Sequence, residues 1–324
     1  MKRIDTQQAA LRLRDCSAAC IFTHSHPDGD ALGSAFALAH ALRAMGKDAC
    51  VLCEDPMPAM FDYMCGGIEY ITPDSSFSPP ASCLLVAVDI AVAHLLGKAF
   101  EAQFGARIDL SIDHHPSNIF FAAETLLDVS AAAAAEIISD VIDAMGVTIT
   151  TQMAACLYAG ISTDTGCFRY ASTTSRSHFY AARYIDLGVE TQPLNRAFFE
   201  TQSRAYLEME RMAFAGLRYY CEGRVALVAV TQAMFRQSGS NEEEYIQLVA
   251  RTRQIEGVEV GVAIRERPDG THKISLRSHA PVDAAAIAAK MGGGGHVRAA
   301  ACSSELPLEE TIELVVGYIE EALN

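Results

Sequence analysis

The sequence of 324 residues lacks several features that would assign it to a special class of protein. No apolar stretch follows Met1 of the kind that an export signal requires, so we expect a cytoplasmic location. The longest apolar run, 81–97, is interrupted by Asp89 and His94 and is too short for a clean membrane span. Because of these absences, we do not expect a secreted protein or a membrane protein. They favour a soluble protein without a membrane partner.

Regular cysteine spacing and positive charge are also scarce. The ten cysteines are irregularly spaced, which argues against a disulfide scaffold and favours a reducing compartment. Only Cys50 and Cys53 have the spacing of a metal or redox pair, and without a second pair we interpret them as small buried residues. The 25 Lys and Arg residues against 40 Asp and Glu residues give a net charge of −15. That balance excludes a broad basic face for long double-stranded nucleic acid, but not a small polyanion held through metal ions.

The length suggests two domains, and half of the residues are hydrophobic, which is typical of a folded globular protein. In the first half, short apolar runs alternate with helical patterns, which indicates an α/β fold with a parallel, Rossmann-like sheet. One expected helix has Ser130 as its N-cap. The expected strands cover 18–23, 48–54, 82–88 and 107–112, and the expected helices cover 31–45 and 131–145.

The second half changes pattern near 220–223. Residues 152–217 are almost wholly helical in pattern, whereas strands are predicted after them, two of which flank the turn Pro268-Asp269-Gly270. A smaller α/β domain is therefore expected at the C-terminal end. We predict a catalytic domain over 1–190, a helical linker over 191–222 and a substrate-binding domain over 223–324.

The first candidate site is the segment 24–30, His-Ser-His-Pro-Asp-Gly-Asp, at the expected end of the first strand. Ligands bind at the carboxyl ends of strands in open α/β sheets. His24, Asp28 and Asp30 lie on a turn tightened by a proline and a glycine, and imidazole and carboxylate groups bind divalent ions. The alternative is a polar turn in which Asp30 only caps the following helix.

Three further polar groups follow apolar elements. Asp89 ends the third expected strand, Asp113-His114-His115 ends the fourth, and Asp164 lies in a glycine-flanked break after a helix. Adjacent histidines in a strand point to opposite faces, so a turn must begin here if His114 is to bind metal while His115 faces a substrate. The alternative is a surface histidine pair. Together these groups suffice for two divalent ions that share one carboxylate, an arrangement that hydrolyses phosphate esters.

The order and spacing of these motifs resemble the four motifs of the DHH phosphoesterases. The resemblance implies two metal ions with Asp89 as the bridging ligand, Asp113 behind the ligands, and His115 facing the phosphate or the leaving oxygen. Imidazole and carboxylate ligands without cysteine favour Mn²⁺, with Mg²⁺ as the alternative. The resemblance places His24, Asp28 and Asp89 on one ion, and Asp30, Asp89, His114 and Asp164 on the other.

The glycine-rich tail, 292–300, resembles the DHH-associated C-terminal domain of the RecJ-type branch, as does the segment Ser-Leu-Arg-Ser at 275–278. Consecutive glycines let backbone N–H groups approach an anion, and a guanidinium offers a bidentate fork. The alternative is a flexible connector. Ala301 stands where the family usually has glycine, and 90–94 lacks the family's usual polar residues. The resemblance implies that Arg277, Ser278, Gly294, Gly295 and His296, with Arg298 nearby, bind the other phosphate of the substrate.

The chain length and the segment 163–170, Thr-Asp-Thr-Gly-Cys-Phe-Arg-Tyr, are most similar to the compact nano-RNase and pAp phosphatase subgroup of this family. That resemblance implies hydrolysis of short oligonucleotides to mononucleotides and removal of the 3′-phosphate from 3′-phosphoadenosine 5′-phosphate (pAp). The alternatives are a phosphodiesterase of cyclic dinucleotides or their linear products (c-di-AMP, pApA), and a non-catalytic nucleotide sensor. A family II pyrophosphatase is disfavoured because no lysine-rich clamp lies near the C-terminus. An apolar helical linker favours a homodimer.

Overall fold

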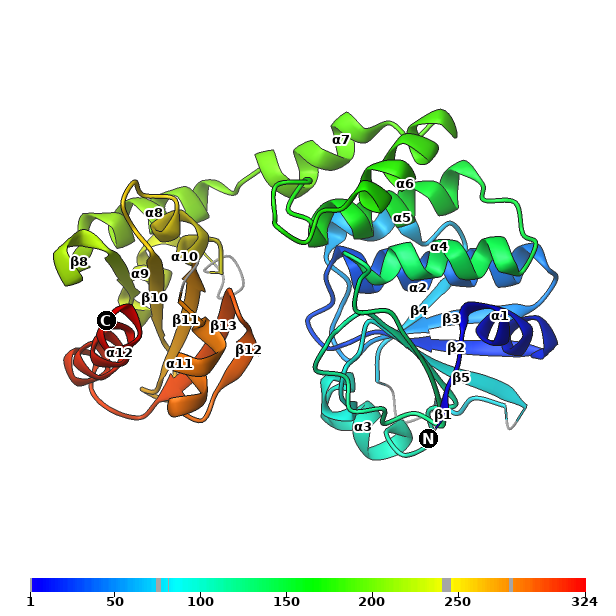
Figure 1. The fold of residues 1–324 in the computed structure, drawn as a ribbon, viewed down its shortest axis with the longest axis horizontal. Coiled ribbons are helices and arrows are strands. Elements are labelled where there is room, and N and C mark those ends of the chain that lie inside the picture. Colours follow the sequence, from blue (N-terminus) through cyan, green and yellow to red (C-terminus); the bar gives the residue numbers. More distant parts are fainter. Residues whose placement is uncertain (1, 74–76, 81, 241–245, 280–281) are drawn as a thin grey trace. The chain divides into compact units, whose positions relative to one another are not determined.

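The computed structural model describes residues 2–73, 77–80, 82–240, 246–279 and 282–324. The chain forms two compact units, residues 1–201 and residues 202–324 (Figure 1). Each unit contains one β-sheet with its own helices. The predicted α/β class is therefore confirmed for both halves of the chain.

The first unit contains a seven-stranded sheet in the order β1-β7-β6-β5-β2-β3-β4, and every pair in it is parallel. All residues of the central strand β5 are buried, as expected for a parallel strand covered on both faces. The four predicted strands correspond to β2, β3, β5 and β6, whereas the three short outer strands were not predicted. The strands are β1 (Lys2–Arg3), β2 (Ala18–Phe22), β3 (Asp48–Leu52), β4 (Glu69–Ile71), β5 (Cys83–Val88), β6 (Leu110–Asp113) and β7 (Glu124–Leu127).

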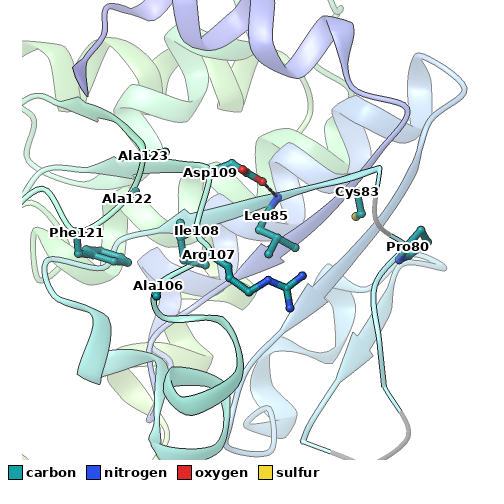
Figure 2. Close-up of a pocket in the computed structure, with 10 residues that line it drawn as sticks. All are labelled: Pro80, Cys83, Leu85, Ala106, Arg107, Ile108, Asp109, Phe121, Ala122 and Ala123. Atoms are coloured by element: carbon teal, nitrogen blue, oxygen red, sulfur yellow. Dashed lines mark hydrogen bonds between the residues drawn. The ribbon is translucent and has the colours of Figure 1, made fainter. Parts of the chain in front are cut away.

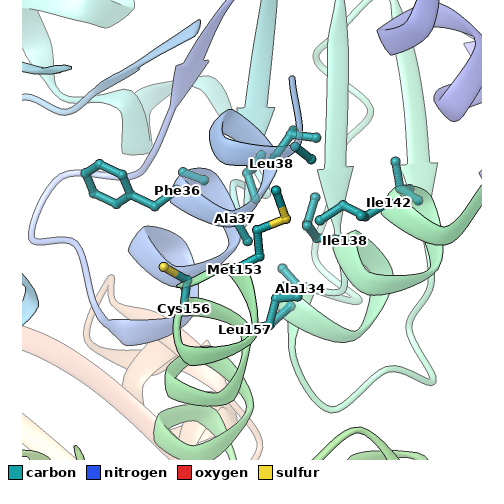
Figure 3. Close-up of a cluster of buried hydrophobic side chains, with 14 of the residues drawn as sticks. Phe36, Ala37, Leu38, Ala134, Ile138, Ile142, Met153, Cys156 and Leu157 are labelled. Atoms are coloured by element: carbon teal, nitrogen blue, oxygen red, sulfur yellow. The ribbon is translucent and has the colours of Figure 1, made fainter. Parts of the chain in front are cut away.

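Helices α2, α4 and α5 form one layer on this sheet, and their side chains build its larger apolar core (Figure 3). The crossing of α2 and α5 is close because Gly33 has no side chain: a Cβ there would lie 2.2 Å from the carbonyl oxygen of Cys156. The helices of the unit are α1 (Thr6–Asp15), α2 (Gly29–Ala44), α3 (Lys98–Phe104), α4 (Ala134–Ala144), α5 (Thr151–Asp164), α6 (Ser175–Asp186) and α7 (Thr191–Asn195), with 3₁₀ turns at Ala59–Met64 and Ala93–Leu96 and a π-helical turn at Arg196–Glu200.

The predicted N-cap of α4 is wrong. The helix begins at Ala134 rather than after Ser130, whose hydroxyl donates to the Asp128 carboxylate at 2.6 Å. The amides of Ala134 and Ala135 instead donate to the Asp30 carboxylate, at 2.6 and 2.9 Å. A carboxylate about a hundred residues away therefore caps the helix, which no local pattern reveals.

The second unit contains a six-stranded sheet in the order β12-β13-β11-β10-β9-β8. The predicted hairpin is confirmed: β10 and β11 are antiparallel, and Gly270 adopts a φ of 82° in the turn between them. The strands are β8 (Arg218–Tyr220), β9 (Val225–Val230), β10 (Val260–Glu266), β11 (His272–Ser278), β12 (Gly294–His296) and β13 (Ala299–Ser304), and the helices are α8 (Arg204–Ala215), α9 (Gln232–Ser238), α10 (Ile246–Arg253), α11 (Ala284–Lys290) and α12 (Leu308–Leu323).

The boundary between the two units lies after Thr201, inside the segment expected as a linker. Helix α8 belongs to the second unit because Tyr206, Met209 and Ala213 pack into a core with strand β9. The helical pattern of the segment is therefore present, but it is divided between the two units.

Two further expectations concern the state of the cysteines and the presence of a membrane-spanning helix. All ten cysteines are free thiols. Cys53 is fully buried and its thiol lies 3.2 Å from the carbonyl oxygen of His24, while the Cys50 sulfur lies 3.7 Å from that of Cys20. In the part of the chain that the structure describes, no helix combines the length and apolar character needed to cross a bilayer.

Candidate metal centre

The candidate site lies at the carboxyl ends of three neighbouring strands. Strands β6, β5 and β2 are adjacent in the sheet, so the residues that follow them meet at one edge. These residues are His24 after β2, Asp89 after β5, and the histidine pair after β6. The structure thereby brings together groups that lie far apart in the sequence, as expected for an open parallel sheet.

Two aspartates at the start of α2 have separate tasks. Asp28 is the N-cap of the helix, and its Oδ1 accepts hydrogen bonds from the amides of Asp30 and Ala31 at 3.0 Å. Asp30 is fully buried and accepts from the N-terminus of α4 and from the hydroxyl of Ser34 at 3.3 Å. The interpretation in which Asp30 only caps its own helix is therefore wrong.

Glycines set the approach of α5 to this site. A Cβ at Gly29 would lie 2.5 Å from the Thr163 hydroxyl, and a Cβ at Gly160 would lie 2.7 Å from Asp30 Oδ1. Because neither glycine carries a side chain, the end of α5 lies against the start of α2. Asp164, the last residue of α5, consequently lies close to Asp30 and His114.

Asp89 occupies the centre of the cluster. Its backbone has a φ of 61°, in the left-handed region that aspartate tolerates better than most residues, and its amide donates to the carbonyl of Ile112 at 2.9 Å. The side chain is 3% exposed, and Oδ1 has no hydrogen-bond partner among the described residues. A buried carboxylate oxygen that accepts no hydrogen bond fits a bound cation, since a buried polar atom normally has a partner.

Two groups of ligand atoms flank Asp89. In the first, His24 Nε2 lies 3.8 Å from Asp28 Oδ1 and 3.7 Å from Asp89 Oδ2. In the second, His114 Nε2 lies 3.9 Å from Asp30 Oδ2, 3.5 Å from Asp164 Oδ2 and 3.4 Å from Asp89 Oδ1. Three sets of candidate ligand atoms each lie within 4.8 Å of one another: those of His24, Asp28 and Asp89, those of Asp30, His114 and Asp164, and those of Asp89, His114 and His115. The six residues expected as ligands thus form two adjacent cation-sized groups, and Asp89, a member of the first, contacts His114 of the second.

Several carboxylates lie close together in the cluster, and this crowding shifts the pKa values of its members. Burial raises the pKa of Asp30 and Asp164 above its ordinary range, and neighbouring carboxylates add to that shift. Burial alone would lower the pKa of His24 and His114, but Asp89 raises these values to about 10 and about 11. Burial would raise the pKa of Asp89, yet the two imidazoles hold it below its usual value. The cluster therefore favours positive charge at its centre, whether protons or cations.

The two adjacent histidines are held by different partners. Asp113 is fully buried, and its Oδ1 lies 2.8 Å from His115 Nδ1 and accepts from the amide of His114 at 2.9 Å. His114 Nδ1 lies 3.2 Å from the carbonyl oxygen of Ala131, which leaves its Nε2 toward Asp89. The turn that starts after Asp113 therefore brings both imidazoles to one side, with ring centroids 4.4 Å apart.

Asn118 is a contributor that the sequence analysis missed. Its buried amide donates to Asp113 Oδ2 at 2.7 Å, and its side-chain oxygen accepts from the amide of Phe120 at 2.7 Å. Asn118 thus holds the carboxylate that orients His115. An asparagine shortly after the histidine pair was the only available signal, and it does not differ from that of an ordinary turn residue.

We expect the substitution Asn118→Ala to lower kcat by about tenfold, because a misoriented partner of an active-site imidazole typically costs 10–100-fold. It also leaves Asp113 Oδ2 without its donor, so the free energy of unfolding should fall by about 1–3 kcal/mol. Steady-state kinetics and urea unfolding measure the two effects. Asn118→Asp places a second negative charge beside Asp113 and should be more severe; an unchanged kcat in both variants would contradict the role of Asn118.

Two of the expected substrate-binding residues are occupied within the second unit. Ser278 is 1% exposed, and its hydroxyl donates to the carbonyl of Val282 at 2.7 Å. Arg298 donates to the same carbonyl at 2.7 Å and to that of His279 at 3.2 Å. Both side chains therefore bond to the carbonyl of Val282 and are already engaged within the unit. The half-buried Arg277 lies on the other face of β11, and the side chain of His296 lies outside the described part of the structure.

The second half of the glycine run belongs to a strand and is not a flexible connector. Gly294 and Gly295 belong to β12 and pair with Ala301 and Ala300 of β13. Gly295 has a φ of 143°, and a Cβ there would lie 2.5 Å from the carbonyl oxygen of Ala299, so glycine is required. Around Gly294 the space is open. The approach of an anion to this backbone stays a prediction from the glycine pattern.

A separate hollow of about 530 Å³ lies at the amino ends of β5 and β6, away from the candidate ligands (Figure 2). Asp109, at its rim, accepts a hydrogen bond from the amide of Leu85 at 2.9 Å. None of the sequence-predicted site residues lines this hollow, which places it outside the candidate centre. Its lining consists of Pro80, Cys83, Leu85, Ala106, Arg107, Ile108, Asp109, Phe121, Ala122 and Ala123.

Comparisons with known proteins agree with this geometry. Residues 18–161 match the model of the DHH family, N-terminal domain, and residues 224–324 match the DHHA1 domain. A bifunctional oligoribonuclease and PAP phosphatase NrnA from Thermus thermophilus is 35% identical over 94% of this chain and 90% of its own length. The cyclic-di-AMP phosphodiesterase GdpP of Bacillus subtilis is 25% identical over 95% of this chain but 48% of its own length.

The fold comparison extends over both units. The crystal structure of an exopolyphosphatase-related protein from Bacteroides fragilis superposes with a TM-score of 0.89 and 22% identity, covering 98% of this chain and 96% of that chain. At this identity the match shows the shared fold. The sequence matches and the ligand cluster therefore point to one family.

Proposed function

Because this chain belongs to the DHH family of phosphoesterases, we propose that it hydrolyses very short oligonucleotides to mononucleotides and removes the 3′-phosphate of pAp. The observation that carries the proposal is the pair of ligand groups on either side of Asp89, whose Oδ1 has no hydrogen-bond partner among the described residues. The NrnA relative supports the substrate class, since the match covers 90% of that protein.

The residues present fit two divalent ions. His24, Asp28 and Asp89 would hold one ion, and Asp30, Asp89, His114 and Asp164 would hold the other. When bound, two such ions supply a water of lowered pKa and neutralise charge on the phosphate oxygens. Because the donors are carboxylate oxygens and imidazole nitrogens, we propose Mn²⁺ as the cofactor and Mg²⁺ as the alternative.

His115, oriented by its partners, would donate a proton to the leaving oxygen of the phosphate ester. Asp113 fixes the proton on Nδ1, which leaves Nε2 to donate toward the leaving oxygen. Burial alone would lower the pKa of His115, but the carboxylates of Asp113 and Asp89 raise it. These carboxylates therefore favour the protonated imidazole, which is the form that a general acid requires.

In the second unit, Arg277 and the open backbone at Gly294 would bind a phosphate that is not cleaved. Arg277 lies on β11, and β13 pairs with both β11 and β12, which places these groups on one sheet. A guanidinium and exposed backbone amides are the standard protein partners of a phosphate. We keep Ser278, Gly295, His296 and Arg298 in this proposed set, with Ser278 and Arg298 acting through the Val282 carbonyl to which both donate.

The second candidate activity is hydrolysis of cyclic dinucleotides or their linear products. The match to GdpP favours it, but that match covers less than half of GdpP and has lower identity than the match to NrnA. The intact ligand set argues against a non-catalytic sensor. Short linear substrates are therefore the leading proposal.

We further propose that the protein lies in a reducing compartment and that it associates with itself. The ten free cysteines support a cytoplasmic location, because no disulfide stabilises either unit. A homodimer remains an expectation from the sequence, and light scattering on the full chain would test it directly.

The decisive test is a product-resolved panel with Mn²⁺ present and after chelation. We expect pAp, a dinucleotide and a pentanucleotide to yield mononucleotides, c-di-AMP to react more slowly by at least tenfold, and every rate to fall to background with chelator. Returning Mn²⁺ should restore activity, which controls for denaturation. Turnover that survives chelation would contradict the metal proposal, and a preference for c-di-AMP would transfer the assignment to the second candidate.

A further inference from the structure

The entry segment of α4, residues 128–133, and the first turn of that helix contact two candidate ligands of the second cation group. The carbonyl oxygen of Ala131 lies 3.2 Å from His114 Nδ1. The first two amides of α4 donate to the Asp30 carboxylate at 2.6 and 2.9 Å. The position of the entry segment therefore fixes where the imidazole and the carboxylate lie, so a group that holds this segment acts on the centre without touching a cation.

The start of α4 gives up a helical hydrogen bond to make these contacts. In a regular α-helix the amide of Ala135 would donate to the carbonyl of Ala131. Here that amide donates to Asp30, and the carbonyl faces His114. The backbone of Ala133 is extended, with φ −154° and ψ 151°, so the helical bond does not form. Both halves of the missing hydrogen bond are therefore used by candidate ligands.

A buried carboxylate of α4 orients the peptide group that faces the imidazole. Glu136 is fully buried, and its Oε2 accepts a hydrogen bond from the amide of Ala132 at 3.3 Å. That N–H and the Ala131 carbonyl belong to one peptide, which is planar, and in the trans form the two bonds point in opposite directions. An acceptor on the amide side therefore aims the carbonyl at His114 Nδ1. Because a carbonyl only accepts, Nδ1 carries the proton and Nε2 is left to bind a cation.

Two residues of α6 hold Glu136 in place. The hydroxyl of Ser177, which is also fully buried, donates to Glu136 Oε1 at 2.6 Å. Arg176 Nε lies 3.6 Å from Glu136 Oε2, and its Nη1 donates at 2.7 Å to Asp128, at the start of the entry segment. A carboxylate is costly to bury unless it is paired and hydrogen-bonded, and these contacts meet both conditions. Helix α6 therefore supports the entry segment although it supplies none of the candidate ligands.

We propose that Glu136 is a positioning residue for the metal centre. Through the Ala131–Ala132 peptide it orients His114, and it thereby raises the affinity of the second cation group. This inference rests on the proposed function, because it requires that His114 binds a metal ion. Among the described residues, no hydrogen bond joins the entry segment to His24 or Asp28, so the effect is confined to one of the two groups.

Calorimetric titration with Mn²⁺ tests the proposal without turnover. In Glu136→Ala the affinity of one Mn²⁺ site should fall by about 10–100-fold, as expected when a metal ligand loses its support, while the other site is unchanged. Glu136→Gln keeps an acceptor for the Ala132 amide and should recover most of that loss. A role in stability alone would not weaken one site selectively. The Mn²⁺ concentration for half-maximal hydrolysis of pAp should rise by the same factor in Glu136→Ala.

A second pair of variants keeps the proposal testable if Glu136→Ala does not fold. Arg176 and Arg183 both lie on α6 and pair with carboxylates of α4, and their side chains are 28% and 30% exposed. Arg183 contacts both oxygens of Asp143, at 2.5 and 2.7 Å, near the end of α4 that is remote from the entry segment. Lysine keeps the charge but not the planar fork that reaches several acceptors. Arg176→Lys should weaken one Mn²⁺ site by about tenfold, whereas Arg183→Lys should leave both sites unchanged.

Urea unfolding of the chelated variants checks that each of them is folded. If folded Glu136→Ala and Arg176→Lys both bind two Mn²⁺ ions with unchanged affinity, the positioning role is wrong and the proposed function stands. If Arg176→Lys is the only one of the two that folds, its titration against that of Arg183→Lys decides alone. If the unmodified protein neither binds Mn²⁺ nor hydrolyses pAp, the proposed function itself fails, and the positioning role fails with it.

Discussion

Asp89→Asn should abolish activity while leaving the fold intact, with kcat reduced by about a thousandfold or more. The side chain lies within 3.7 Å of His24 Nε2 and within 3.4 Å of His114 Nε2, so it serves both ligand groups. Asparagine keeps the size of the residue and tolerates its left-handed backbone, with φ at 61°, but it removes the negative charge that the two groups share. The loss is therefore one of cation binding and not of packing.

Calorimetric titration with Mn²⁺ measures this effect independently of turnover. We expect two ions per chain in the unmodified protein and at most one, bound weakly, in Asp89→Asn. Asp48→Asn is the matched control: the Asp48 side chain is 89% exposed and its nearest cation, Arg43, is 3.8 Å away. Normal metal stoichiometry and normal kcat in folded Asp89→Asn protein would overturn the assignment of Asp89 as the shared ligand.

The second large effect, a loss of stability, is expected from the single methyl group that the substitution Gly160→Ala adds. In Gly160→Ala the new Cβ would lie 2.7 Å from Asp30 Oδ1 and 2.7 Å from the Cβ of Ala135, so α2, α4 and α5 must separate. Overpacking a tight core typically costs 1–3 kcal/mol, and this site adds the disturbed cap of α4. We expect a loss of about 3 kcal/mol in the free energy of unfolding, with weaker binding at the Asp30 group.

Urea unfolding and Mn²⁺ titration of the same protein samples test this prediction. Gly317→Ala is the control, because Gly317 lies in α12 with no atom within 4 Å of its Cβ position. Alanine there should raise stability by about 0.5–1 kcal/mol through helix propensity. If Gly160→Ala were as stable as the unmodified protein, the close approach of the three helices would not matter to the site.

The metal centre shows how far local reasoning extends. Each ligand motif follows an apolar run that was recognisable as a strand or helix, and parallel strands bring their carboxyl ends to one edge. His24, Asp89 and the pair after Asp113 were predictable as neighbours for that reason. The sequence also identified the hairpin around Gly270, because its turn chemistry is local.

Contacts between distant segments were outside the reach of any sequence window. The cap of α4 comes from Asp30 and not from Ser130, and the partner of Asp113 is Asn118. Ser278 resembles a phosphate ligand in the motif, yet its hydroxyl turns inward to the carbonyl of Val282. In each case a side chain had several potential partners, and the packing of distant segments decided which of them lies beside it.

By itself, the sequence determined the α/β class, the order of the chemical motifs and the residue types of a two-cation centre, because hydrophobic periodicity and ligand chemistry are properties of short segments. The tertiary structure alone decided which aspartate caps which helix, where α8 belongs, and how closely α5 approaches α2 at Gly33. These features depend on strand register and helix crossing. Both are set by the packing of the whole unit. The same local sequence pattern can therefore have different partners in different tertiary structures.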